Sequence, residues 1–422
     1  MTNLKFKIAY FLDKLLKIET SERKFFLLAL IGSFCITFEY AIIRPVSNAF
    51  FLSFFKSTDL PYVWLLTVPL SWIVMQVYNY LLPRLGVKKV CFLVCFLIIS
   101  FSLLSCFFAI GSKYLSFIFY AWKEIYIVLM FQQLWSVINS TLKLKNAKRS
   151  YGILFAGGGI GSILGSLIPM FKAVSWGSSY LLLFSMPIYG FFMFNYLNML
   201  KESEKIRKQP LGLEKNLPKE KNIFHSFSLI KKSKLLKVIL GLVVFMQMTG
   251  CLADFQVNTA LQTNLEGVDL RAATLAKAMS IVAVCTIVLQ ILGPVLLIKF
   301  FGLKYGHLCI PLSLACCTLP ALIHQDFSNI LFSFVAIKSC DFSVFNIMKE
   351  MLYLPLKEDE KFRAKAFIDV FAYRATKGLA SILLFFFPLL FSSSLAFSIY
   401  LCMILIFMIW AILIIKGLDN KI

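Results

Sequence analysis

The chain lacks the residue sets on which most enzymes and metalloproteins depend. Its three histidines, His225, His307 and His324, are far apart in sequence, and it has no Walker loop and no Ser-His-Asp set. Its eleven cysteines show no metal-ligand spacing, so we interpret them as small apolar residues within helices. The sequence therefore predicts no enzyme, no catalytic residue, no metal site and no cofactor.

The chain also lacks a polar segment long enough to form a soluble domain. Its longest polar interval, residues 201–233, is rich in Lys, Glu and Pro and has no apolar periodicity, so we interpret it as a linker. The N-terminus lacks a small-residue cleavage site and carries acidic residues that transit peptides avoid. Residues 1–24 instead favour an amphipathic helix on the cytoplasmic surface of a membrane.

Apolar sequence dominates the chain. Hydrophobic residues make up 59% of it, mean hydropathy is +0.81, and its 44 Phe and 16 Tyr suit lipid-facing and interfacial surfaces. A membrane-spanning helix needs about 20 apolar residues. Such runs lie at 25–43, 61–82, 90–110, 114–138, 152–171, 178–199, 236–258, 276–299, 305–323, 328–348, 366–390 and 393–415. The sequence predicts an all-α membrane protein with twelve transmembrane helices.

The formal charge of +22 follows the loops between these runs. Basic residues gather before the first run, in alternate loops and in the 201–233 interval, while the intervening loops carry very few. Because cytoplasmic loops are enriched in Lys and Arg, the alternation places both termini and the linker in the cytoplasm. It predicts a multi-pass protein whose surroundings are the lipid bilayer, with no nucleic-acid partner.

The chain repeats itself weakly at an offset of about 217 residues. The matching positions are Gly86-Val87-Lys88 with Gly302-Leu303-Lys304, Ala147-Lys148 with Ala364-Lys365, and Glu124 with Asp341. They fall at equivalent places in a six-plus-six topology, which predicts a parallel repeat of the major facilitator architecture. We expect six-helix bundles at 25–199 and 236–416, a basic linker at 200–235, a tail at 417–422, and substrate bound between the halves.

Lys123 and Glu124 lie side by side within the apolar run 114–138. An ionisable residue at the centre of a membrane helix costs about 2.5 to 3.5 kcal/mol, so it persists where it faces a wet cavity or a partner charge. These charges predict a transport protein with a polar path. Other candidates for that path are Arg44, Asn48, Gln76, Gln132, Gln133, Asn139, Gln247, Asp254, Gln256, Asn258, Gln290, Lys338, Asp341 and Asn346.

The glycine-rich string FAGGGIGSILGS, residues 155–166, has two interpretations. Glycine-rich runs bind phosphates at helix starts, but no strand precedes this one and no GK[ST] follows. Gly157, Gly161 and Gly165 instead repeat every fourth residue, which is typical of two membrane helices in close contact. We therefore predict helix packing here, with Pro169 bending the same helix.

Three groups of charges keep two interpretations each. Arg44 could extend to the membrane interface, or could bind an anion from a segment broken at Pro45. Arg374 and Lys377 share a helical face that suits a polyphosphate, or could join Asp369 in a cytoplasmic salt-bridge network. Lys349 and Glu350 are likewise either a solvated pair or part of such a network.

The motifs KEMLYLPL, at 349–356, and KAFIDV, at 365–370, followed by a basic pair, resemble the ATP/ADP translocase family of obligate intracellular bacteria and plastids. AKRSYGILF, at 147–155, is similar to the family's AKRFYALFG, and Lys123-Glu124 stands against the family's AE. The resemblance covers most of the chain. It implies a nucleotide carrier that works by antiport or proton symport. We expect this carrier in the bacterial cytoplasmic membrane, and the sequence leaves its oligomeric state open, with a monomer as the expectation.

The resemblance also implies roles for single residues. Arg44 and Glu124 match the family, Asp254 stands where the family has Glu, and Ser47 and Asn258 stand where it has Lys. YRATKG, at 373–378, keeps the two cations of GRxGKS without its glycines. Expected substrate-binding residues are Arg44, Lys123, Glu124, Asn139, Asp254, Asn258, Asp341, Arg374 and Lys377. Expected gating or coupling residues are Lys148, Arg149, Lys349, Glu350, Lys365 and Asp369.

Two other functions stay open on the sequence. One is a proton-coupled carrier of another anionic metabolite, with a buried carboxyl group carrying the proton. The other is a membrane scaffold that transports nothing. A scaffold has no need of Glu124 in hydrocarbon, and this distinguishes it from both carriers.

Overall fold

The computed structural model describes residues 22–109, 111–141, 144–207, 230–353, 356, 368, 372–390 and 394–418, without the side chains of 144–152, 373 and 388–390. The expected amphipathic N-terminal helix, most of the linker and most of the tail lie outside the described residues. The regular structure of the described part is helical throughout.

By its internal contacts the chain divides into two compact units. Unit 1 comprises residues 1–51 and 71–217. Its elements are α2 (Arg23–Phe54) as far as residue 51, most of α3 (Leu60–Phe108), α4 (Lys113–Thr141), α5 (Leu144–Trp176), α6 (Ser178–Leu181), the 3-10 turn η2 (Leu182–Phe184) and α7 (Ser185–Arg207).

Unit 2 comprises residues 52–70 and 218–422. It contains the end of α2, the 3-10 turn η1 (Ser57–Asp59) and the first turns of α3. It continues with α9 (Lys234–Asn264), α10 (Val268–Ile323), α11 (Phe327–Cys340), the π-helical turn η3 (Asp341–Phe345), α12 (Asn346–Leu352), α14 (Tyr373–Leu390) and α15 (Leu395–Gly417).

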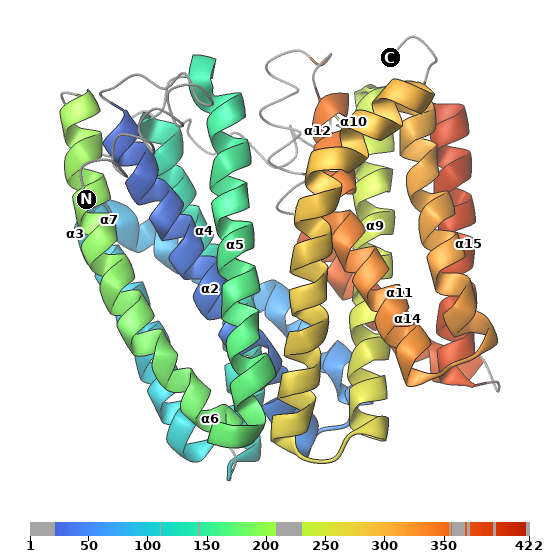
Figure 1. The fold of residues 1–422 in the computed structure, drawn as a ribbon, viewed down its shortest axis with the longest axis horizontal. Helices are drawn as coiled ribbons and strands as arrows, with labels where there is room; N and C mark the ends of the chain where they lie inside the picture. The colour runs from blue at the N-terminus through green and yellow to red at the C-terminus, as the bar shows by residue number, and fades with distance from the viewer. Residues whose placement is uncertain are drawn as a thin grey trace. The chain divides into compact units, whose positions relative to one another are not determined.

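Nine helices of the described residues are long and apolar enough to cross a membrane. Two of them, α3 with 49 residues and α10 with 56, far exceed the 20 or so residues that one crossing needs. Gly86 and Gly302 interrupt these helices with φ of 76° and 71°, a conformation that glycine adopts without strain. Figure 1 shows α10 turning back on itself. Each is therefore two spans, and with α14 the predicted twelve-helix, all-α fold is confirmed.

Large apolar side chains cover the outside of the helices as well as their inside. Trp72, Phe96, Phe107, Phe171 and Phe194 are each more than 60% exposed. Such rings are stable in contact with lipid, and their number fits a protein embedded in a bilayer.

The glycine-rich string packs α5 directly on α2. A Cβ atom on Gly161 would meet the Phe34 carbonyl oxygen, and one on Gly165 would meet the backbone of Phe38. The Thr37 hydroxyl donates a hydrogen bond of 2.7 Å to the carbonyl of Gly158, which only this close approach allows. The predicted packing role is confirmed, and Pro169 lies inside α5 as expected.

We expect Gly165→Ala to destabilise unit 1, because the new methyl group meets rigid backbone and overpacking costs about 1 to 3 kcal/mol. Gly190→Ala is the matched control, since a Cβ there has open space around it. The measurement is the unfolding temperature of each purified variant in detergent. Equal temperatures for the two variants would contradict this packing.

Candidate functional site

In unit 1, Lys123 of α4 is the centre of a buried polar cluster. Its side chain is 1% exposed, and its ammonium group donates a hydrogen bond to Asn48 Oδ1 on α2. Lys123 Nζ lies 3.5 Å from Glu124 Oε1 and 3.7 Å from the centroid of the Tyr120 ring. An amide oxygen, a carboxylate and the face of an aromatic ring all favour a cation. The burial of this charge is therefore compensated from three sides.

Arg44 lies on α2 one turn before Asn48, so the two residues share a helical face. The expected break at Pro45 is wrong, because α2 runs without interruption from Arg23 to Phe54 and carries Pro45 inside it. Membrane helices tolerate proline where neighbouring groups satisfy the freed backbone carbonyl. Arg44 is half-buried, and Ser47 beside it is fully buried.

In unit 2, a second buried lysine occupies α11. Lys338 Nζ lies 2.7 Å from Asp254 Oδ2 on α9, and the Lys338 side chain is 9% exposed. Lys338 was a candidate for the polar path but was not in the expected substrate-binding set, which contained Asp254. The sequence signal was a cation and an acid in one span, Lys338 and Asp341, as with Lys123 and Glu124.

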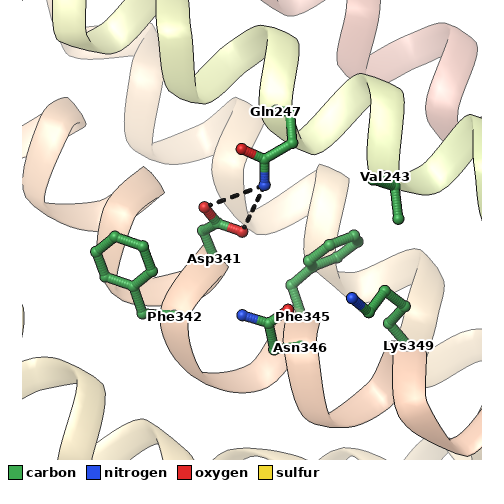
Figure 2. A pocket seen from close by; sticks show the side chains of 7 residues that line it. All are labelled: Val243, Gln247, Asp341, Phe342, Phe345, Asn346 and Lys349. Atoms are coloured by element: carbon green, nitrogen blue, oxygen red, sulfur yellow. Dashed lines mark hydrogen bonds between the residues drawn. The ribbon is translucent and has the colours of Figure 1, made fainter. Parts of the chain in front are cut away.

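Asp341 follows on the next turn, at the start of η3, and is 2% exposed. Gln247 Nε2 on α9 donates hydrogen bonds of 3.2 and 3.4 Å to its two carboxylate oxygens. The carboxylate is therefore held in place by an amide. Figure 2 shows this pair at one side of a pocket of about 190 Å³. The lining residues are Val243, Gln247, Asp341, Phe342, Phe345, Asn346 and Lys349.

Three of the expected substrate-binding residues, Asn139, Asn258 and Lys377, are not part of the clusters around Lys123, Lys338 and Asp341. Asn139 is exposed near the end of α4, about 24 Å along the helix from Lys123. Asn258 is buried, but its amide donates to the carbonyl of Asp254 one turn earlier. Lys377, in the first turns of α14, places its ammonium 5.3 Å from the centroid of the Trp64 ring.

The remaining expected residues are placed as follows. Arg374 is half-buried at the start of α14, Lys349 is 9% exposed at the pocket, and Glu350 beside it is exposed. Four expected gating residues have side chains outside the described residues: Lys148, Arg149, Lys365 and Asp369. Among the described residues, no group of three or more His, Cys, Asp or Glu could hold a metal ion.

Comparison with protein families gives one match that covers most of the chain. Residues 103–421 match the family model for the TLC ATP/ADP transporter. The chain belongs to this family. The resemblance identified in the motifs around residues 349–378 is thereby confirmed, and the TLC family makes the chain a membrane transporter of nucleotides. A search of curated protein sequences finds no significant match.

Solved structures confirm the major-facilitator-like fold of this TLC-family chain. A mutant of the nucleoside transporter NupG is 11% identical, with a TM-score of 0.66 over 94% of this chain and 100% of its own. A POT family transporter bound to a thioalcohol-conjugated peptide is 13% identical, with a TM-score of 0.67 over 93% and 96%. The inward-open xylose transporter XylE from E. coli is 17% identical, with a TM-score of 0.61 over the same shares.

One buried carboxylate was missed by sequence reasoning. Glu39 of α2 is fully buried and accepts hydrogen bonds from three hydroxyl groups. Ser185 donates at 2.8 Å, Tyr126 at 2.9 Å and Tyr189 at 3.0 Å, from α7 and α4. Glu39 thus joins three helices of unit 1. A single Glu inside the run 25–43 was the available signal, but its partners lie about 90 to 150 residues away.

A second missed cluster fixes the end of α2 within unit 2. Gln262 of α9 donates to the carbonyls of Leu52 and Phe55, and its Oε1 accepts from Ser57 N at 2.7 Å. Arg271 of α10 donates to the carbonyls of Leu52 and Leu265 at 2.9 Å. The last carbonyls of a helix have no partner within it, so these two side chains cap α2.

We expect Glu39→Leu to destabilise unit 1, because three buried hydroxyl groups lose their acceptor at about 1 to 3 kcal/mol each. Glu39→Gln keeps one acceptor oxygen and should lie between the wild type and Glu39→Leu. Unfolding temperature and the yield of monodisperse protein measure the order. A Leu variant as stable as the wild type would show that these hydrogen bonds contribute nothing.

Proposed function

We propose that this chain carries ATP, ADP or a related nucleotide across the bacterial cytoplasmic membrane by alternating access, with both termini in the cytoplasm. Besides membership of the TLC family, the supporting observation is a buried lysine in a membrane-spanning helix of each unit. Lys123 and Lys338 are each held against the oxygens of their own unit. A buried lysine that is paired with a partly exposed carboxylate suits the binding and release of an anion.

The chemistry of these lysines suggests how an anion takes part. Asp254 neutralises Lys338, and Glu124 neutralises Lys123, whose ammonium group also donates a hydrogen bond to Asn48 Oδ1. A phosphate oxygen can replace these partners, because it offers the ammonium group a full negative charge at hydrogen-bond distance. The carboxylate set free then needs water or a ligand donor, since an unpaired buried charge is costly. Binding of substrate and rearrangement of the ion pair are thus linked.

The proposal assigns further cations to the phosphate groups. Arg44, on the helical face that carries Asn48, and Arg374 and Lys377, at the start of α14, are the candidates. Ser47 and Asn258 replace two lysines that the resemblance leads one to expect. We propose that Lys123 and Lys338 supply cations in place of those two lysines. At Lys123 the family motif has alanine. The gating roles of Lys148, Arg149, Lys349, Glu350, Lys365 and Asp369 remain part of this proposal.

The test measures uptake of labelled ATP and ADP by bacterial cells that express the protein. We expect nucleotide entry, and we expect Lys123→Gln and Lys338→Gln each to lower its rate about tenfold or more, because a charge-assisted contact is lost. Lys299→Gln is the control, since Lys299 is exposed on α10. If no nucleotide enters while other anions do, the nucleotide proposal fails. An uncoupler that abolishes entry would favour proton symport over exchange.

The variant Glu124→Gln tests whether the protein is a carrier or a scaffold that transports nothing. We expect this variant to fold, because Gln preserves the shape of a side chain that is 22% exposed, and to lose most of its transport, because Lys123 loses its carboxylate partner. Uptake per folded molecule is the measurement. A variant with undiminished activity would argue against any role of this ion pair in transport.

A further inference from the structure

We propose that the pocket between α9, η3 and α12 is the subsite for the nucleobase, and that it selects bases with an exocyclic amino group. This inference rests on the proposed function and adds to it the part of the substrate that unit 2 recognises. The pocket lies wholly within unit 2, and all of its lining residues are shown in Figure 2.

The polar groups of the pocket offer acceptors at Asp341 and Gln247 and donors at Asn346 and Lys349. The Asp341 carboxylate can only accept hydrogen bonds when ionised, and Gln247 Nε2 already donates to both of its oxygens. The same amide group carries Gln247 Oε1, which is an acceptor (Figure 2). A ligand that fits here brings an N–H donor to Asp341 and an acceptor to Asn346 or Lys349. The Asp341 carboxylate repels a phosphate group, and the proposal places the phosphates at the cations assigned to them above.

The apolar part of the lining suits a planar ring. Phe342 is 36% exposed, Phe345 is buried, and the two rings lie on either side of the Asp341 carboxylate in Figure 2. Stacking of a base on an aromatic side chain is worth about 1 to 3 kcal/mol. Pockets for whole drug-sized ligands are about 300 to 1,000 Å³. The volume of about 190 Å³ therefore suits one portion of a nucleotide, such as its base.

The π-helical turn η3 is what gathers these groups. In an α-helix, residues five apart diverge by about 140°. A π-helix closes its hydrogen bonds between residues five apart, so Asp341 and Asn346 come to the same side. Figure 2 shows the ends of Asn346 and Lys349 turned toward the space beside Asp341. Such turns are rare and frequent at functional sites, which is a second, independent indication of a binding site.

The four common bases differ in the groups that they would present. Adenine, guanine and cytosine each carry an amino group, which donates to a carboxylate or to an amide oxygen. Uracil has an N–H between two carbonyl oxygens, and those oxygens would face Asp341 and Gln247. UTP is therefore expected to be the weakest of the four ligands.

The test uses liposomes that contain the purified full chain, are loaded with ADP and take up labelled ATP. Unlabelled ATP, GTP, CTP and UTP compete in separate assays. We expect UTP to need a concentration at least about fivefold higher than the others for half-inhibition. Asp341→Asn exchanges an acceptor for an N–H donor and should narrow or reverse that difference. Lys338→Gln is the control and should weaken all four competitors alike.

The outcomes separate this inference from the function on which it rests. Equal competition by all four nucleotides in the wild type would overturn the base subsite but would not contradict nucleotide transport. This measurement uses the wild-type protein alone, so it does not depend on the folding of a variant. Equal weakening of all four by Asp341→Asn overturns it as well. If instead Asp341→Asn changes only the ratio between ATP and 2′-deoxy-ATP, the pocket holds the ribose. If none of the four competes or enters, the proposed function itself fails.

Discussion

A charge buried among membrane helices must keep a partner, and the polar interior of this protein is organised by that constraint. Lys123 has an amide oxygen, a carboxylate and a ring face, while Lys338 has Asp254. Asp341 has Gln247, and Glu39 has three hydroxyl groups. The cost of leaving any one alone in hydrocarbon is several kcal/mol, on the order of a whole domain's net stability.

These partners differ in how easily they can be exchanged. Glu39 is closed in by hydroxyl groups from two other helices and is fully buried, so its contacts serve the packing of unit 1. Asp254 and Glu124 are 23% and 22% exposed, which leaves them open to a competing ligand. The need to pair buried charges thus produces a structural cluster around Glu39 and two exchangeable ion pairs, Lys123–Glu124 and Lys338–Asp254.

The sequence predicted those features that depend on local periodicity and failed where distant residues meet. Twelve apolar runs and the glycine spacing of α5 were sufficient for the fold and for one helix contact. Pro45 was misjudged, because whether a proline breaks a membrane helix depends on neighbouring helices. Glu39, Gln262 and Arg271 could not be assigned, since their partners are determined only once the chain has folded. The π-helical turn has no signature in the hydrophobic pattern either.

Gly86 and Gly302 place the same unusual backbone conformation in the two longest helices. Both have left-handed φ with extended ψ, 160° at one and −178° at the other, and both precede a basic turn at matching places of the two halves. A torsion that side-chain-bearing residues rarely adopt admits few substitutions, so a larger residue at either position would strain the backbone at the turn. Each of the two longest helices thus depends on the missing side chain of one glycine to reverse its course.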